Sequence, residues 1–192
     1  MCCAKTWWTL LAVVLLLSGC GDMGDDLYPS DQDQRPSVSA GSTGHLPGQL
    51  AAEFSLTTST ALSFQLSDHL SGGSAEADAV VLYFTMWCPT CLAHSDHMYN
   101  LVIPRFQSRG TVVYALVDYV SGSVPAARAS ETANGYAGSD FITLVDGQRA
   151  VMDQFNAAMG TVVVIARDGT ILMNQDYRNG DTLQQTLDAL LP

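Results

Sequence analysis

A pair of cysteines, Cys88 and Cys91, lies between two segments whose patterns indicate different secondary structure. Residues 79–85 (AVVLYFT) form a continuous run of apolar, β-branched and aromatic side chains, typical of a central strand covered on both faces. Residues 89–109 place apolar side chains along one helical stripe, and Pro89 suits the first helical position because the N–H it lacks would find no partner there. Cysteines three positions apart in a first helical turn lie on one side of the helix and can close a small disulfide ring. A buried strand that leads directly into such a helix indicates an α/β domain.

The position of Cys88 predicts a reactive thiol. At the helix N-terminus the unpaired N–H groups and the dipole favour an anion, which lowers the pKa of a thiol and makes the first cysteine the nucleophile. Trp87 is expected to shield one side of the pair and to present a flat docking surface, bordered by Pro89 and Thr90. We interpret the pair as redox-active. A structural disulfide would not need the strand-to-helix junction, and no second cysteine pair completes a four-thiolate zinc site.

The remaining residues predict further strands and helices, and residues 51–192 are assigned to one domain. Strands are expected at 53–58, 61–66, 111–119, 141–145, 161–166 and 170–174, and helices at 126–136 and 181–191. Pro104 is expected to kink or end the helix over 89–109, because proline removes a donor and clashes with the preceding turn. The order of elements predicts a central mixed β-sheet flanked by helices, with an N-terminal strand pair.

Residues 1–19 have the pattern of a secretory signal peptide. Lys5 is followed by a mostly apolar run over residues 7–17, which is too short to span a bilayer because spanning needs about 20 residues. Residues 17–20 (LSGC) resemble the lipobox of bacterial lipoproteins. This resemblance implies that Cys20 is lipidated and becomes the first residue of the mature chain. The alternative is a plain signal peptide, or an uncleaved anchor, in which Cys20 is incidental.

Residues 20–50 are predicted to comprise the lipidated cysteine and a flexible tether. The segment is rich in Asp, Gly, Ser, Pro and Gln, so it cannot bury enough apolar surface to offset its ordering entropy. Cleavage would remove Cys2 and Cys3, and the exported compartment permits disulfides. Only Cys88 and Cys91 would then keep free thiols.

Acidic residues outnumber basic ones by 19 to 8, which gives a formal net charge of −11. This balance argues against nucleic acid or anionic lipid as the main electrostatic partner. Membrane contact is therefore expected through the lipid on Cys20.

Trp87-Cys88-Pro89-Thr90-Cys91 after a buried strand resembles the active site of the thioredoxin superfamily. Residues 53–57 (EFSLT) and 66–68 (LSD) resemble the entry strands of its redoxin branch, which includes the membrane-anchored TlpA-type thiol-disulfide oxidoreductases. The resemblance covers residues 51–192. It implies a thioredoxin-like α/β fold whose redox-active Cys88–Cys91 disulfide, with no other cofactor, exchanges with the thiols and disulfides of partner proteins. In that chemistry Cys88 forms the mixed disulfide and Cys91 resolves it.

The same resemblance implies a reductase on the periplasmic side of a bacterial membrane, supplied by a membrane electron donor. The residues themselves leave the direction of exchange and the choice of membrane open, because direction depends on the potential of the pair against that of its compartment.

One departure from the family concerns the loop that faces the cysteines. The family has a cis-proline there, and counting back from the Asp168-Gly169 turn places that position at Gly160. Proline would remove a donor and shield the cysteines, whereas glycine leaves room and an extra N–H. We expect Met159, Gly160 and Thr161 to border a substrate groove. The alternative is that Gly160 is a plain turn residue.

A second departure follows Cys91. Several TlpA-type proteins carry a glutamate three residues after the second cysteine, where it helps to move protons. Here that position is His94, with His97 one turn further on. A histidine near Cys91 titrates near neutrality and could accept the proton of the resolving thiol. The alternative is a half-exposed helix histidine, and for His97 this alternative is preferred.

Other functions are weighed against disulfide exchange. A copper chaperone of thioredoxin fold would use Cys88, Cys91 and a nearby histidine, since soft thiolates suit Cu(I). Residues three apart drift around a helix, however, so Cys88, Cys91, His94 and His97 would not easily converge on one ion. A peroxiredoxin-like function rests on Thr85 three residues before Cys88 but lacks the proline expected upstream. A pure interaction module would not need the cysteine pair.

Overall fold

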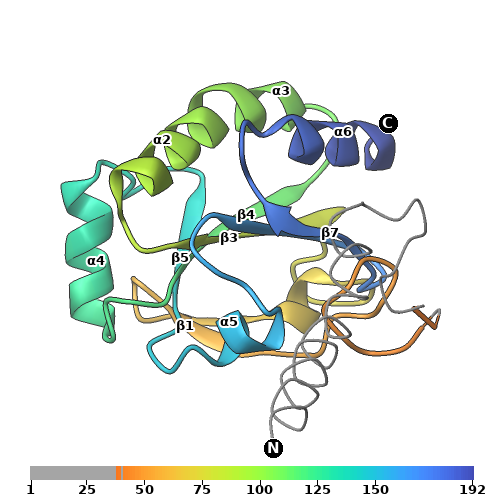
Figure 1. Ribbon diagram of the computed structural model, residues 1–192, viewed down its shortest axis with the longest axis horizontal. Coiled ribbons are helices and arrows are strands. Elements are labelled where there is room, and N and C mark those ends of the chain that lie inside the picture. The colour runs from red at the N-terminus through yellow and green to blue at the C-terminus, as the bar shows by residue number, and fades with distance from the viewer. Residues whose placement is uncertain (1–37, 40) are drawn as a thin grey trace, which may run out of the picture. The chain divides into compact units, whose positions relative to one another are not determined.

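The predicted central strand, β3 (Ala79–Thr85), is confirmed, and every one of its residues is buried. It lies between β4 and β6 in a seven-stranded sheet (Figure 1). The protein is seen here as a computed structural model that describes residues 38, 39 and 41–192. The predicted signal peptide (1–19), Cys20 and the tether through residue 37 lie outside the described residues.

The sheet is mixed, as predicted. Its strand order is β2-β1-β5-β4-β3-β6-β7, with β3, β4 and β5 parallel to one another and the other neighbouring pairs antiparallel. The short pair β1–β2 forms one edge, which confirms the expected N-terminal strand pair. The remaining strands are β1 (Ser55–Thr58), β2 (Ser63–Gln65), β4 (Val112–Asp118), β5 (Phe141–Val145), β6 (Thr161–Ala166) and β7 (Ile171–Asp176).

Helices cover both faces of the sheet. In Figure 1, α2, α3 and α6 lie over one face, α5 lies on the opposite side, and α4 lies beside β5. The predicted helices over 126–136 and 181–191 are confirmed within a few residues, whereas α5 was not predicted because it is shorter than two helical turns. Helical segments are η2, a 3-10 turn (Leu66–His69), α2 (Pro89–His97), α3 (Ile103–Phe106), α4 (Val124–Ala133), α5 (Ala150–Gln154) and α6 (Asp181–Leu190).

The long helix after the cysteines is interrupted before Pro104 and ends shortly after it. A π-helical segment (Met98–Val102) joins α2 to α3, and α3 ends at Phe106, two residues after Pro104. The ring of a proline clashes with the carbonyl of the preceding turn, and the wider π turn lies where that clash would occur. The predicted distortion is therefore present but starts one turn earlier.

Alternate residues of β3 contribute to two separate cores. Ala79, Val81 and Tyr83 belong to the core that contains Cys91 and side chains of α6. Val80, Leu82 and Phe84 belong to the core on the other face, together with Phe155 after α5. This period of two follows from the alternation of side chains along a strand, and it places Tyr83 on the same face as Cys91.

The folded domain begins earlier than the predicted boundary at residue 51. Residues 41–50 lie along the first part of β7, where the N–H of Ile171 donates to the carbonyl of Gln49 at 2.8 Å and Leu50 bridges Thr170. The side-chain amide of Asn174 donates to the carbonyl of His45 at 2.8 Å. The segment covers an otherwise open sheet edge through backbone groups, which polar composition cannot reveal.

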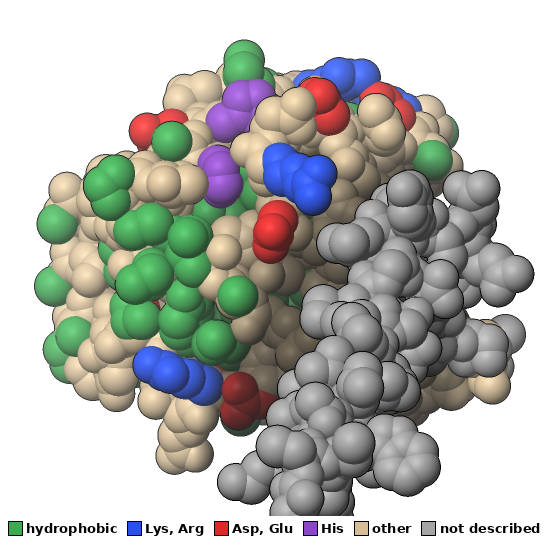
Figure 2. All heavy atoms as spheres, in the orientation of Figure 1, with side chains coloured by type: hydrophobic (Ala, Val, Ile, Leu, Met, Phe, Trp, Pro, Cys, Tyr) green, Lys and Arg blue, Asp and Glu red, His purple; other side chains and the backbone are tan. Residues whose placement is uncertain are grey.

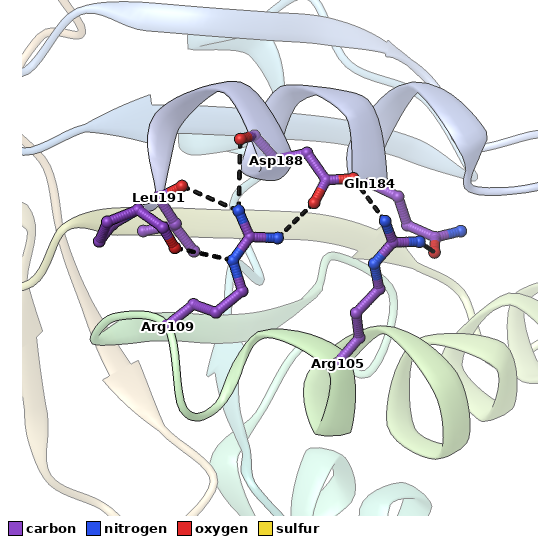
Figure 3. A network of polar contacts seen from close by, with 6 residues as sticks. Arg105, Arg109, Gln184, Asp188 and Leu191 are labelled. Carbon is purple, nitrogen blue, oxygen red and sulfur yellow. Dashed lines mark hydrogen bonds and ion pairs between the residues drawn. The ribbon is translucent and has the colours of Figure 1, made fainter.

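Two arginines, one in α3 and one just after it, bind α6 and the residue that follows it (Figure 3). Arg105 donates to Gln184 at 2.9 Å and to Asp188 at 2.6 Å. Arg109 binds Asp188 as well and donates to the carbonyl of Leu191 at 2.9 Å. These contacts hold α6 against α3 and the turn that follows it. Within the described residues, no helix has the length and apolarity needed to cross a membrane.

Candidate functional site

Cys88 and Cys91 face each other at the N-terminus of α2, and both are free thiols. Their Sγ atoms are 2.8 Å apart, close to the approximately 2.05 Å of a disulfide bond, so oxidation needs only a small movement. Cys88 is the N-cap residue of α2, and its sulfur accepts a hydrogen bond from the N–H of Cys91 at 3.2 Å. Cys88 is partly exposed, whereas Cys91 is fully buried. Only the first cysteine can meet a partner directly.

The surroundings of Cys88 favour its thiolate. Burial by itself raises the pKa of the Cys88 thiol. Hydrogen bonds from the Cys91 side chain and from the backbone of Cys91, Thr90 and Cys88 outweigh burial and bring the pKa below its ordinary value. The predicted direction of the shift is therefore present, and its cause is the donor-rich first turn of the helix.

Trp87 is held in an unusual backbone conformation beside the cysteines. Its φ angle is +60°, a left-handed value that costs free energy for a residue with a side chain. Its N–H donates to Oγ1 of Thr85 at 3.1 Å, and its indole N–H donates to Oδ2 of Asp118 at 2.8 Å. The ring stacks on Tyr136 at a centroid distance of 6.4 Å. These contacts fix the indole beside Cys88.

Asp118 was not identified from the sequence. It is fully buried at the end of β4, and its other oxygen accepts the N–H groups of Val120 and Ser121 at 3.0 and 2.9 Å. One carboxylate thus holds both Trp87 and the turn after β4. The sequence did contain a signal, because Asp118 is an acid within an otherwise apolar run over 111–119. A buried carboxylate needs several hydrogen-bond donors, so this acid could have been expected to organise its surroundings.

The loop before β6 contains Gly160 opposite the cysteine helix, as counted from the sequence, but it differs from a cis-proline loop. The described residues contain no cis peptide bond, and Gly160 has a φ of +84°. A Cβ on Gly160 would lie 3.9 Å from the ring of His94. The expected spare N–H is absent, because the Gly160 N–H donates to the carbonyl of Phe84 at 3.0 Å. The loop is therefore a fixed part of the site.

The other predicted groove residues divide into exposed and buried ones. Pro89, Thr90 and Met159 are exposed, and Trp87 is half-buried. Thr161 is buried, and its hydroxyl accepts the N–H of Ala158 at 3.0 Å, so its side chain serves the loop. Apolar side chains form a continuous patch on the face shown in Figure 2, with histidines and arginines at its border.

His94 lies near the pair but is bonded to a residue that the sequence did not single out. Its Nδ1 and the hydroxyl of Tyr83 are 3.0 Å apart. Burial lowers the pKa of His94, the charge of His97 lowers it further, and a hydrogen bond to the backbone of Arg178 opposes them in part. The imidazole is therefore held in its neutral form near neutrality.

His97 belongs to a second contact on the same helix. Its Nδ1 lies 2.6 Å from the hydroxyl of Tyr177, whose ring packs against the ring of His94 at 4.7 Å. The N–H of Tyr177 donates to the carbonyl of Gly160 at 2.8 Å. Tyr177 thus joins the loop before β6 to both histidines of α2.

The residues named for a copper site do not come together. Among residues 38, 39 and 41–192, no group of three or more His, Cys, Asp and Glu side chains is placed to hold a metal ion. His94 and His97 instead have tyrosine hydroxyls as partners. Within the part of the chain that the structure describes, the geometry offers the copper alternative no donor set beyond the two thiols.

A mixed sheet with a dithiol at the junction of β3 and α2 defines a thioredoxin-like protein. The family model that matches the chain is Redoxin, over residues 46–190, and the chain belongs to this family. The match also begins before residue 51, in agreement with the segment that covers β7.

Solved structures share the fold of this chain. DsbF of MTB, solved in mixed oxidised and reduced forms, is 22% identical, with a TM-score of 0.57 over 71% of this chain and 94% of that one. A secreted Mycobacterium tuberculosis disulfide oxidoreductase is 20% identical, with a TM-score of 0.53 over 71% and 96%. Peroxidoxin BcpB from Mycobacterium tuberculosis is 23% identical, with a TM-score of 0.58 over 75% and 97%. At these identities the likeness shows the fold. No curated protein matches the chain.

Proposed function

We propose that this protein is an extracytoplasmic thiol-disulfide oxidoreductase that exchanges disulfides with partner proteins through Cys88 and Cys91. The observation that carries the proposal is the pair itself. A partly exposed thiol with a lowered pKa lies 2.8 Å from a buried thiol at the start of a helix. Such a pair combines an accessible nucleophile with a protected second thiol.

In the reducing direction the chemistry has two steps. The thiolate of Cys88 attacks one sulfur of a partner disulfide, forms a mixed disulfide, and releases the other partner sulfur as a thiolate that takes up a proton. Cys91, once deprotonated, attacks Sγ of Cys88, forms the Cys88–Cys91 disulfide, and releases the second partner thiol. The partner gains two electrons and the dithiol loses two. A membrane electron donor would restore the dithiol.

The proposed location combines the sequence with the relatives. The LSGC tetrapeptide ending at Cys20 supports export and lipid anchoring on the periplasmic side of a membrane. A structural neighbour is described as a secreted disulfide oxidoreductase. We assign the reducing direction, of TlpA type, on the family resemblance alone.

Trapping of intermediates tests the exchange. A Cys91→Ser variant of the full chain should accumulate mixed disulfides with cellular proteins, visible as thiol-sensitive bands on non-reducing gels. The matched control is the Cys88→Ser, Cys91→Ser double variant, which should accumulate none. Equal band patterns for the two variants would refute exchange through Cys88.

A measurement of the redox potential against glutathione tests the direction. A reductase should have a potential well below that of the glutathione couple, so that the dithiol passes electrons to partner disulfides. A potential well above that couple would instead assign the protein to disulfide formation.

A further inference from the structure

The burial of Cys91 poses a problem for the second step of the exchange. The thiolate is the nucleophile, so Cys91 must lose its proton before it attacks Cys88. Its side chain has no exposed surface, which prevents direct transfer of the proton to bulk water. An internal acceptor with its own route to solvent is required.

Tyr83 and His94 supply such a route. The Tyr83 side chain lies in the same core as Cys91, and its hydroxyl is 3.0 Å from Nδ1 of His94. Tyr83 is 1% exposed, whereas His94 is only half-buried. The contact therefore runs from the buried surroundings of Cys91 to the protein surface through two side chains.

We propose that the hydroxyl of Tyr83 relays the proton of Cys91 to Nδ1 of His94 when the mixed disulfide is resolved. This inference rests on the proposed function. The thiol proton passes to the oxygen of Tyr83, and the hydroxyl proton of Tyr83 passes to Nδ1. The products are a Cys91 thiolate and a His94 imidazolium. The imidazolium N–H then donates to the tyrosine oxygen, and the tyrosine O–H donates to the thiolate.

The ionisation properties of both relay residues fit these roles. Burial raises the pKa of Tyr83, and thiolate charges on Cys91 and Cys88 and a hydrogen bond with Cys91 raise it further. Tyr83 therefore stays protonated and can only pass a proton on. The lowered pKa of His94 leaves Nδ1 an unprotonated acceptor near neutrality.

The groups around His94 also orient its ring. Tyr177 packs against the imidazole at 4.7 Å, Gly160 leaves room on the loop side, and one ring atom hydrogen-bonds the backbone of Arg178. The charge of His97, on the same helix, lowers the pKa of His94. A ring that is packed and hydrogen-bonded on its other sides presents a defined nitrogen to its partner. Nδ1 is thereby directed at Tyr83.

The relay can be tested in single turnovers of the reduced full-length chain with dithiobis(nitrobenzoate), with Cys2, Cys3 and Cys20 replaced by serine in every protein so that only Cys88 and Cys91 react. The first coloured thiolate is released when Cys88 attacks the reagent, and the second when Cys91 resolves the mixed disulfide, so the two phases separate the two steps. We expect Tyr83→Phe and His94→Gln to slow the second phase by roughly a hundredfold or more near neutral pH, as typical for loss of general base catalysis. The first phase should keep its wild-type rate.

The pH profile distinguishes proton transfer from a packing role. The second phase of both variants should approach the wild-type rate as pH rises, because hydroxide then deprotonates Cys91 in place of the relay. His94→Gln keeps a side-chain acceptor for the Tyr83 hydroxyl but cannot take a proton. It therefore separates the two roles even if Tyr83→Phe folds poorly. The matched controls Tyr99→Phe and His69→Gln make the same chemical changes away from the site and should react as wild type does.

Two results would overturn the relay. One is a second phase in His94→Gln that has the wild-type rate at every pH. The other is a variant in which both phases are slowed equally and the slowing does not depend on pH. Failure of the proposed function would look different. The wild-type protein itself would show no second phase, which would mean that Cys91 does not resolve the mixed disulfide at all.

Discussion

The N–H of Gly160 donates to the carbonyl of Phe84 at 3.0 Å, which ties the loop before β6 to the end of the strand that precedes the cysteines. The carbonyl of Gly160 accepts from the N–H of Tyr177. Both backbone groups of one residue therefore join three segments of the site. A proline cannot make the first contact, since it has no N–H.

This geometry predicts that restoring the proline of related proteins damages the protein. Gly160→Pro removes the hydrogen bond to Phe84 and cannot adopt a φ of +84°, because proline is fixed near −65°. We expect a loss of about 3 kcal/mol or more in unfolding free energy, measured by denaturant titration of the reduced protein. Gly160→Ala keeps the N–H and should lose only about 1–2 kcal/mol through its left-handed backbone. A proline variant as stable as wild type would show that the loop can switch to a cis-proline conformation.

The contact between Asp118 and Trp87 predicts a coupled loss of stability and site geometry. Asp118→Ala leaves the indole N–H and the N–H groups of Val120 and Ser121 without their acceptor. An unsatisfied buried donor costs about 1–3 kcal/mol, and the cost is lower here because these three donors are only part-buried and water can reach the vacated space. We expect a loss of at least about 2 kcal/mol in unfolding free energy and an altered Trp87 fluorescence spectrum.

Asp140→Ala serves as the control for that variant, because Asp140 is an exposed acid just before β5, at the opposite end of these parallel strands from Asp118. It should match wild type in both measurements. Unchanged fluorescence in Asp118→Ala, with the expected loss of stability, would mean that the carboxylate supports the turn after β4 but does not position the indole.

The strands were predictable where local sequence alone determined them. The bounds of β3, β5 and β6 agree with the predicted ranges, because each is an apolar run ended by polar or turn residues. The cysteine pair could also be placed at the start of α2, since the apolar strand and the helical stripe meet there. These features depend on neighbours in the sequence.

The features that escaped prediction depend on residues far apart in the sequence. Trp87 and Asp118 are 31 positions apart, and no pattern within either segment indicates their hydrogen bond. Tyr83 looked like one more apolar residue of a buried strand, although its hydroxyl partners His94. The segment over 41–50 resembled a tether because its contacts with β7 use mainly backbone groups. Contacts of this kind are set by the fold as a whole.

Lipid anchoring through Cys20 gives a prediction that is independent of the redox site. Cys20→Ala removes the thiol to which a lipid would be attached, so the variant should fail to incorporate labelled fatty acid and should leave the membrane fraction or keep its signal peptide. The control is the Cys2→Ala, Cys3→Ala double variant, which should be labelled like wild type. Labelling of Cys20→Ala would place the lipid elsewhere, and labelling of no variant, wild type included, would favour a plain signal peptide.

The lowered pKa of Cys88 predicts how reactivity depends on pH. The rate of alkylation of Cys88 by iodoacetamide follows the thiolate, so its midpoint in the wild-type protein should lie below that of an unperturbed thiol, about 8.5. Cys91→Ala removes the hydrogen bond from the neighbouring thiol but keeps the Cys91 backbone donor, so the midpoint should rise without reaching the unperturbed value. A midpoint that does not move would assign the shift to the helix backbone alone.

The same shift predicts a dependence of stability on pH in the reduced protein. An acid whose pKa is lower in the folded state stabilises that state as its anion. The contribution of Cys88 is complete above the pKa of an unfolded thiol and is lost as pH falls through the lower pKa of the folded state. The difference in unfolding free energy between the reduced wild type and Cys88→Ala should therefore decrease as pH is lowered through this window. A difference that is constant with pH would mean that packing, and not the thiolate, accounts for the contribution of Cys88.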